Sequence, residues 1–121
     1  SDLLRTVLGF AASTPQLPVI AKGNAGIPKY VDGHIHYDGT PELMGQYAVL
    51  ARNCGAKIIG GCCGTMPEHL VAMRAALENT PKNAAPSLDE ITAVLGDFSS
   101  ASDGLGENEP APTRRNRRKR A

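Results

Sequence analysis

Only two segments of this 121-residue chain have the character of buried strands, and helices are predicted around them. Residues 17–21 and 56–59 are short apolar runs bounded by turn-forming residues, which is typical of strands covered on both faces. Strands that alternate with helices form right-handed parallel units. Two parallel strands cannot cover themselves. We therefore predict an α/β fold in which this chain supplies only part of a larger sheet.

Four helices are predicted from side chains that can cap a helix and from apolar residues at helical spacing. Their predicted starts are at Ser1, Thr40, Thr65 and Ser87. Thr65 and Ser87 are each followed three residues later by a glutamate, which is the spacing of a capping box. In the third helix, Leu70, Met73 and Leu77 are predicted to face inward.

Two adjacent cysteines, Cys62 and Cys63, directly follow the second strand in the run GGCCGT. Glycines on both sides give the backbone the freedom that neighbouring thiols need to face one cation. Thiolates bind zinc, but two cysteines do not complete a zinc site. A pair of reduced cysteines in a tight turn is the alternative, and a disulfide between them is a further one. Cys54 is predicted near a helix end, at the opposite end of the strand, so we interpret it as a buried apolar side chain.

Residues 60–70, GGCCGTMPEHL, resemble the last strand, loop and helix of the homocysteine S-methyltransferase family. Residues 22–28, KGNAGIP, resemble the family's asparagine–alanine–glycine loop, although the family often has proline where this chain has Gly23. Within the family, the likeness is greatest to bacterial betaine–homocysteine methyltransferase-like proteins. The resemblance implies the C-terminal part of a (β/α)8 TIM barrel, with its last two strands and their helices. A complete barrel needs about 250 residues.

The resemblance implies zinc-dependent transfer of a methyl group to the thiol of homocysteine, which gives methionine. Cys62 and Cys63 would bind the zinc ion, together with a third cysteine expected upstream of this chain. Betaine is the expected methyl donor, with S-methylmethionine or a corrinoid-bound methyl group as alternatives. We expect the isolated 121 residues to be inactive. The enzyme could form an oligomer.

Asn24 lies just beyond the first strand, and we expect it at the same edge of the sheet as the cysteines. Its amide could form hydrogen bonds with the amino-acid end of homocysteine. Alternatively, Asn24 only shapes the turn, because Asn and Gly tolerate left-handed conformations. The sequence leaves both alternatives open.

Residues 27–40 are predicted to form a long irregular connection, a kind of loop that is often functional. His34 and His36 in this loop have the spacing of two ligands on one strand face, but no acidic or cysteine partner is placed beside them. We interpret them as solvent-facing or loop-anchoring. Tyr30, Asp32 and Asp38 could line the approach of the methyl donor.

The net charge of +1 conceals a strongly basic end. Residues 114–120 contain six Lys and Arg, whereas all twelve acidic residues precede them. We predict three parts: residues 1–80 as the barrel segment, 81–98 as an extension helix, and 99–121 as a disordered basic tail. The tail lacks interleaved aromatic residues, which favours a solvated segment over a contact with nucleic acid.

No run of about 18 apolar residues predicts a membrane span, and no secretory signal is recognised at the N-terminus. Three cysteines form no even disulfide framework, so a reducing cytoplasm is expected. The alternative function is a small stand-alone module that binds zinc or nucleic acid through the cysteine pair and the basic tail.

Overall fold

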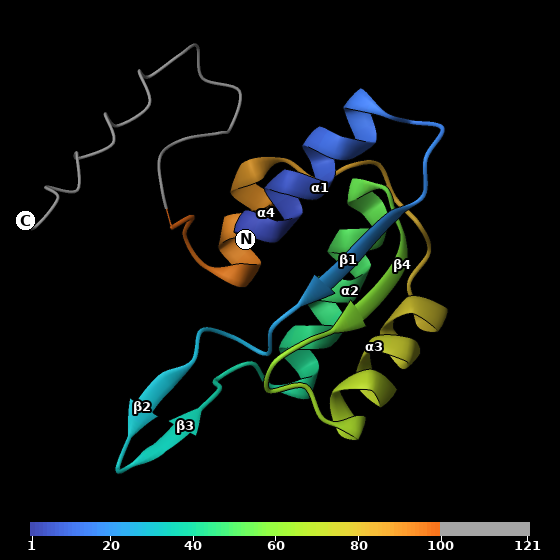
Figure 1. Cartoon of the computed structure of the whole chain (residues 1–121). Coiled ribbons are helices and arrows are strands. Elements are labelled where there is room, and N and C mark those ends of the chain that lie inside the picture. Colours follow the sequence, from blue (N-terminus) through green and yellow to red (C-terminus); the bar gives the residue numbers. More distant parts are fainter. Residues whose placement is uncertain (100–121) are drawn as a thin grey trace, which may run out of the picture.

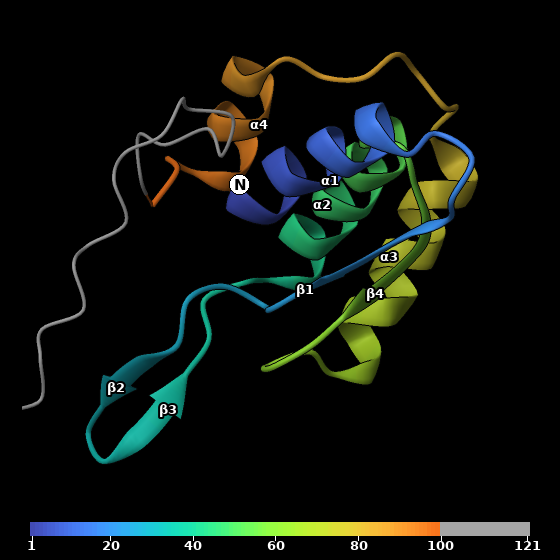
Figure 2. The same ribbon diagram turned by 45° about the horizontal axis from the view of Figure 1, so that its top comes forward.

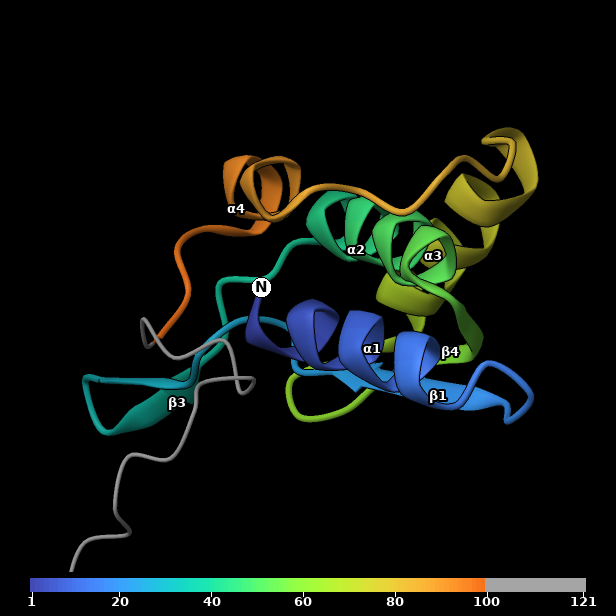
Figure 3. The same cartoon turned by 90° about the horizontal axis from the view of Figure 1, so that it is seen from above.

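The computed structural model describes residues 1–99, and within this range four helices lie on one side of a small parallel sheet (Figures 1 and 3). The helices are α1 (Asp2–Ser13), α2 (Pro41–Cys54), α3 (Pro67–Asn79) and α4 (Leu88–Leu95). The sheet pairs β1 (Val19–Gly23) with β4 (Ala56–Gly61). Residues 100–121, which include nearly all of the predicted basic tail, lie outside the described residues.

The parallel pairing of β1 and β4 confirms the predicted α/β character of the chain. The register places Ile20 opposite Ile58 and Gly23 opposite Gly61. β1 begins two residues later than the predicted strand. The helices cover one face, where Ala21 is fully buried, whereas Ile20 and Ile58 remain 58% and 55% exposed. Within the described residues, the second face of this sheet is therefore uncovered, and it exposes Ile20 and Ile58 together with Lys22.

The connection between β1 and α2 is a β-hairpin, so the prediction of an irregular loop was wrong. β2 (Lys29–Val31) pairs antiparallel with β3 (His34–His36). The turn residues Asp32 and Gly33 both have positive φ angles, 48° and 81°, as a two-residue type I′ turn requires. The hairpin extends away from the body of the molecule, from the end of the sheet at which β1 and β4 finish (Figures 1 and 2).

The predicted helix starts are confirmed for α2 and α4. The Thr40 hydroxyl accepts a hydrogen bond from the Leu43 N–H at 3.2 Å. Ser87 and Glu90 form the reciprocal capping box that their spacing predicts. Gly55 ends α2 in the left-handed region, with a φ angle of 112°.

The predicted capping box of α3 was wrong. Pro67 occupies the first helical position, which favours a helix start after Thr65, and Met66 is therefore the N-cap. The Thr65 hydroxyl is buried without a hydrogen-bond partner, and Glu68 is exposed. Met73 is buried as predicted, but Leu70 is half exposed and does not face inward.

The hydrophobic core is mainly aliphatic and rich in alanine, with Tyr47 as its aromatic member, and in it α2 packs against α1, α3 and the sheet. Its buried apolar residues are Leu4, Val7, Ala21, Ala25, Met44, Tyr47, Ala48, Ala51, Cys54, Ala56, Met73 and Ile91. Ile91 is fully buried and joins α4 to this core. The helix around Ile91 therefore packs on the body of the chain. None of the helices in residues 1–99 has the length and apolar character needed to cross a membrane.

Substitution of Gly55 by alanine tests the left-handed end of α2. A Cβ at this position would lie 2.8 Å from the Cβ of Ala11 in addition to adopting an unfavourable φ angle. We expect Gly55→Ala to lower the free energy of unfolding by about 1–3 kcal/mol, measured by urea unfolding. The control is Gly9→Ala in α1, where no atom lies within 4 Å of the new Cβ. A Gly55→Ala protein as stable as the Gly9→Ala protein would contradict this account.

Candidate functional site

The loops that follow β1 and β4 are joined to each other by backbone hydrogen bonds. The Cys62 N–H donates to the Gly23 carbonyl at 2.8 Å, and the Ala25 N–H donates to the Cys63 carbonyl at 2.9 Å. These bonds continue the parallel ladder beyond the strand ends. The structure thus places Asn24 and the two cysteines at the same edge of the sheet.

The thiols of Cys62 and Cys63 are both exposed, and their sulfur atoms lie 3.8 Å apart. Two sulfurs that each lie about 2.3 Å from a tetrahedral zinc ion are separated by about 3.8 Å. The observed separation therefore fits two ligands of one zinc ion. Within residues 1–99, no group of three or more His, Cys, Asp or Glu side chains could hold a metal ion.

Cys54 is kept apart from this pair by the fold. It is 3% exposed within the core cluster, and burial raises the pKa of its thiol to about 11. The interpretation of Cys54 as a small buried apolar side chain is confirmed.

The turn that contains the cysteines needs glycine at two positions. A Cβ on Gly61 would overlap the Thr65 side chain. Gly64 has a positive φ angle of 75°, and its Cα faces the Tyr37 ring so closely that a Cβ would overlap the ring. The glycines on either side of the thiols thus permit both the backbone turn and the close approach of Tyr37.

Tyr37 is a residue of this site that the sequence analysis did not identify. Its ring lies against Gly64, which directly follows Cys63 in the chain. Burial raises the pKa of Tyr37, and the neighbouring thiols of Cys63 and Cys62 raise it further. The sequence feature that could have identified Tyr37 is its position directly after β3, where the chain returns to the end of the sheet.

The side chains singled out elsewhere in the hairpin region do not contact the thiols through any described hydrogen bond or ion pair. Tyr30 is 78% exposed on β2, and Asp38 forms an ion pair with Lys29 at 2.6 Å. His34 and His36 are exposed on β3, in agreement with the solvent-facing interpretation.

Asn24 is attached to the cysteine turn by its side chain. Its Oδ1 accepts a hydrogen bond from the Cys63 N–H at 3.2 Å. The amide oxygen therefore shapes the turn. The Asn24 side chain is exposed, and its NH₂ group takes no part in that bond.

His69 is a buried polar residue in the first turn of α3, and it is 8% exposed. The sequence analysis did not identify it. Its Nδ1 accepts a hydrogen bond from the Met66 N–H at 3.0 Å. Its Nε2 lies 2.8 Å from the Gly39 carbonyl, to which it donates. The side chain thus connects the start of α3 with the end of the hairpin segment.

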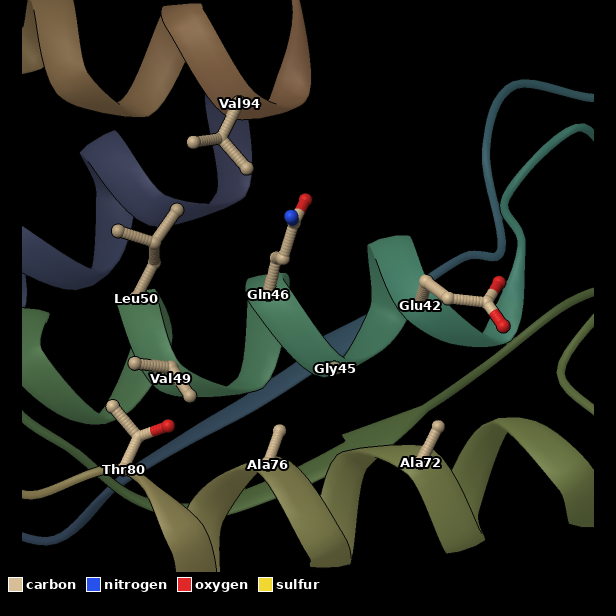
Figure 4. A pocket seen from close by; sticks show the side chains of 9 residues that line it. All are labelled: Glu42, Gly45, Gln46, Val49, Leu50, Ala72, Ala76, Thr80 and Val94. Carbon is tan, nitrogen blue, oxygen red and sulfur yellow. The ribbon is translucent and has the colours of Figure 1, made fainter.

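A separate cavity of about 380 Å³ lies between α2, α3 and α4 (Figure 4). It is lined by Glu42, Gly45, Gln46, Val49, Leu50, Ala72, Ala76, Thr80 and Val94. The lining is mainly aliphatic and includes no residue of the cysteine turn or of the Asn24 loop. The candidate site is therefore the thiol edge of the sheet and not this cavity.

Comparison with known proteins relates the chain to one family and to a longer enzyme. A family model described as homocysteine S-methyltransferase matches residues 1–77. The methionine synthase of Mycobacterium tuberculosis (strain ATCC 25618 / H37Rv) is 35% identical over 65 residues, which are 53% of this chain and 6% of that protein. The chain thus spans only a small part of this relative's length.

Alkylation with iodoacetamide tests the different environments of the three cysteines. At pH 8 a thiol with a pKa of about 11 is ionised in about one molecule in a thousand, and Cys54 is also buried. We expect Cys62 and Cys63 to react in the folded, metal-free protein, and Cys54 to react only after denaturation, as read by peptide mass spectrometry. Labelling of Cys54 at the rate of the pair would contradict the buried position.

Proposed function

The chain belongs to the homocysteine S-methyltransferase family, and we propose that it is part of an enzyme that methylates the thiol of homocysteine to give methionine. The observation that supports this proposal most directly is the pair of exposed thiols, Cys62 and Cys63, 3.8 Å apart at the carboxyl edge of a parallel sheet. The name of the methionine synthase relative agrees with the proposed product.

We propose that the described residues form the last two strands of a (β/α)8 barrel, with residues 1–80 as the barrel segment and 81–98 as an extension. The helices cover one face of β1 and β4, whereas the other face is uncovered and exposes the apolar side chains of Ile20 and Ile58. In a closed barrel this second face would be packed by residues from the other strands. The thiol edge would then lie at the carboxyl end of the barrel, where active sites of this fold are found. A stand-alone module would leave these apolar side chains in water.

Zinc is the proposed cofactor, and the thiol pair fits it in both ligand chemistry and sulfur spacing. Cys62 and Cys63 would hold the ion, with a third protein ligand outside the described residues, as the family resemblance implies. When bound, zinc would lower the pKa of the homocysteine thiol so that the nucleophilic thiolate forms near neutral pH.

The residues around the pair would fix the position of the two sulfurs. The hydrogen bonds that Cys62 and Cys63 form with the end of β1 and with the loop that follows it hold the turn in place. Because the Oδ1 of Asn24 is engaged by the Cys63 N–H, we propose that its NH₂ group donates to the carboxylate of homocysteine. Betaine is the proposed methyl donor, and S-methylmethionine and a corrinoid-bound methyl group are the alternatives.

Removal of single cysteines tests the proposed zinc site. We expect Cys62→Ser and Cys63→Ser in the full-length protein to reduce bound zinc to a substoichiometric level and to abolish methionine formation, because each removes one ligand. Cys54→Ala is the control and should retain both properties, since Cys54 is a buried apolar side chain away from the pair. The assay supplies betaine, S-methylmethionine and methylcobalamin separately, so that it also identifies the donor. Full zinc content and activity in Cys63→Ser would refute the proposed site.

A lysine on the uncovered face tests the proposed barrel. In the full-length protein, Ile58→Lys would place a charge in the barrel interior, and we expect a large loss of soluble, folded protein. In the isolated 121 residues the same change should increase the soluble fraction, because it replaces an exposed apolar side chain. Asn79 is a polar, exposed residue at the end of α3, and Asn79→Lys serves as the control that both forms should tolerate. Equal tolerance of the two lysines in the full-length protein would argue against a barrel.

A further inference from the structure

Three segments that are distant in the sequence are joined by hydrogen bonds next to the cysteine turn. They are the loop after β1, the end of the hairpin segment, and the start of α3. The Ala25 N–H donates to the Cys63 carbonyl, and the Gly39 N–H donates to the Ala25 carbonyl at 2.8 Å. The Gly39 carbonyl in turn accepts from the Nε2 of His69.

His69 closes this series of hydrogen bonds into a ring. Its Nδ1 accepts from the Met66 N–H, and Met66 is connected to Cys63 through the backbone of the turn itself. Because Nδ1 is an acceptor, the ring proton of the neutral imidazole is on Nε2, which is the nitrogen that faces the Gly39 carbonyl. His69 contributes the side-chain hydrogen bonds of this ring, and the others are between backbone groups.

The two hydrogen bonds of His69 have different consequences. The bond with Met66 is local and caps α3, because the two residues are three positions apart. The bond with Gly39 spans thirty positions and connects α3 with a different part of the chain. Gly39 is buried against the backbone of Ala25, with no room for a Cβ, so its carbonyl has a fixed position and requires a donor.

We propose that His69 is a positioning residue for the thiol pair, through its hydrogen bond to the Gly39 carbonyl and not through its helix cap. That bond holds the end of the hairpin segment against Ala25, and Ala25 in turn holds the Cys63 carbonyl. The same segment carries Tyr37, whose ring lies on Gly64. The inference rests on the proposed function where it concerns zinc, and on the described contacts alone where it concerns the loops.

Substitution of His69 by Asn or by Gln tests its two hydrogen bonds separately. In His69→Asn the amide lies near the position of Nδ1, so the cap of α3 can be kept while the bond to Gly39 is lost. In His69→Gln the amide reaches the position of Nε2, so the bond to Gly39 can be kept while the cap is lost. The matched control is His36→Asn, because His36 is exposed on β3.

The measurements are made on the full-length protein with two readouts. In metal-free samples, we expect amide hydrogen exchange at Ala25 and Gly39 to be faster in His69→Asn and close to wild type in His69→Gln. Zinc affinity, measured by competition with a chelator, should fall about 10- to 100-fold in His69→Asn, as is typical when a group that supports a metal ligand is removed. His69→Gln should retain most of the affinity.

The two readouts distinguish failure of the inference from failure of the proposed function. Unchanged exchange at Ala25 and Gly39 in His69→Asn would overturn the positioning role, whatever the zinc affinity. The opposite order, with His69→Gln impaired and His69→Asn intact, would show that only the helix cap matters and would also overturn it. If the wild-type protein binds no zinc, the proposed function fails, and hydrogen exchange in the same metal-free samples still decides the positioning role.

Discussion

The parallel register of β1 and β4 is the constraint on which the rest of the structure depends. Because Gly23 lies opposite Gly61, both strands end at the same level, and the loops that follow them must meet. This register allows the Cys62 N–H to donate to Gly23 at the end of β1 and the Cys63 carbonyl to accept from Ala25 in the loop that follows. A shift of one residue would reverse which side chains face the helices and would separate the two loops.

The sequence predicts the elements best where a local chemical signal fixes them. Thr40 and Ser87 cap helices as expected, since a hydroxyl and a nearby N–H suffice. The prediction of an irregular loop over residues 27–40 overlooks the dipeptide Asp32–Gly33, which favours a type I′ turn. The cap of α3 was misplaced because Pro67 favours a later start than the Thr65 spacing indicates. Each of these errors is local and could be corrected from the sequence alone.

The two residues of the site that the sequence did not predict depend on contacts between distant parts of the chain. Tyr37 and His69 make their defining contacts with Gly64 and Gly39, residues about thirty positions away. No periodicity or spacing within one element encodes such contacts, because they arise only when the strands pair and the loops are brought together. The cysteines and Asn24, in contrast, directly follow apolar strands, so their shared edge could be predicted from parallel pairing.

The spacing of the two thiols has a consequence for their oxidation. A disulfide requires a sulfur–sulfur distance of about 2.05 Å, so the sulfurs would have to approach each other by roughly 1.8 Å. The Cys62 N–H and the Cys63 carbonyl are both bonded to the neighbouring loop, which opposes the backbone change that this approach needs. The turn therefore protects its own sulfurs from pairing with each other. The sulfur spacing that suits two ligands of one zinc ion is thus also a spacing that disfavours a disulfide within the pair.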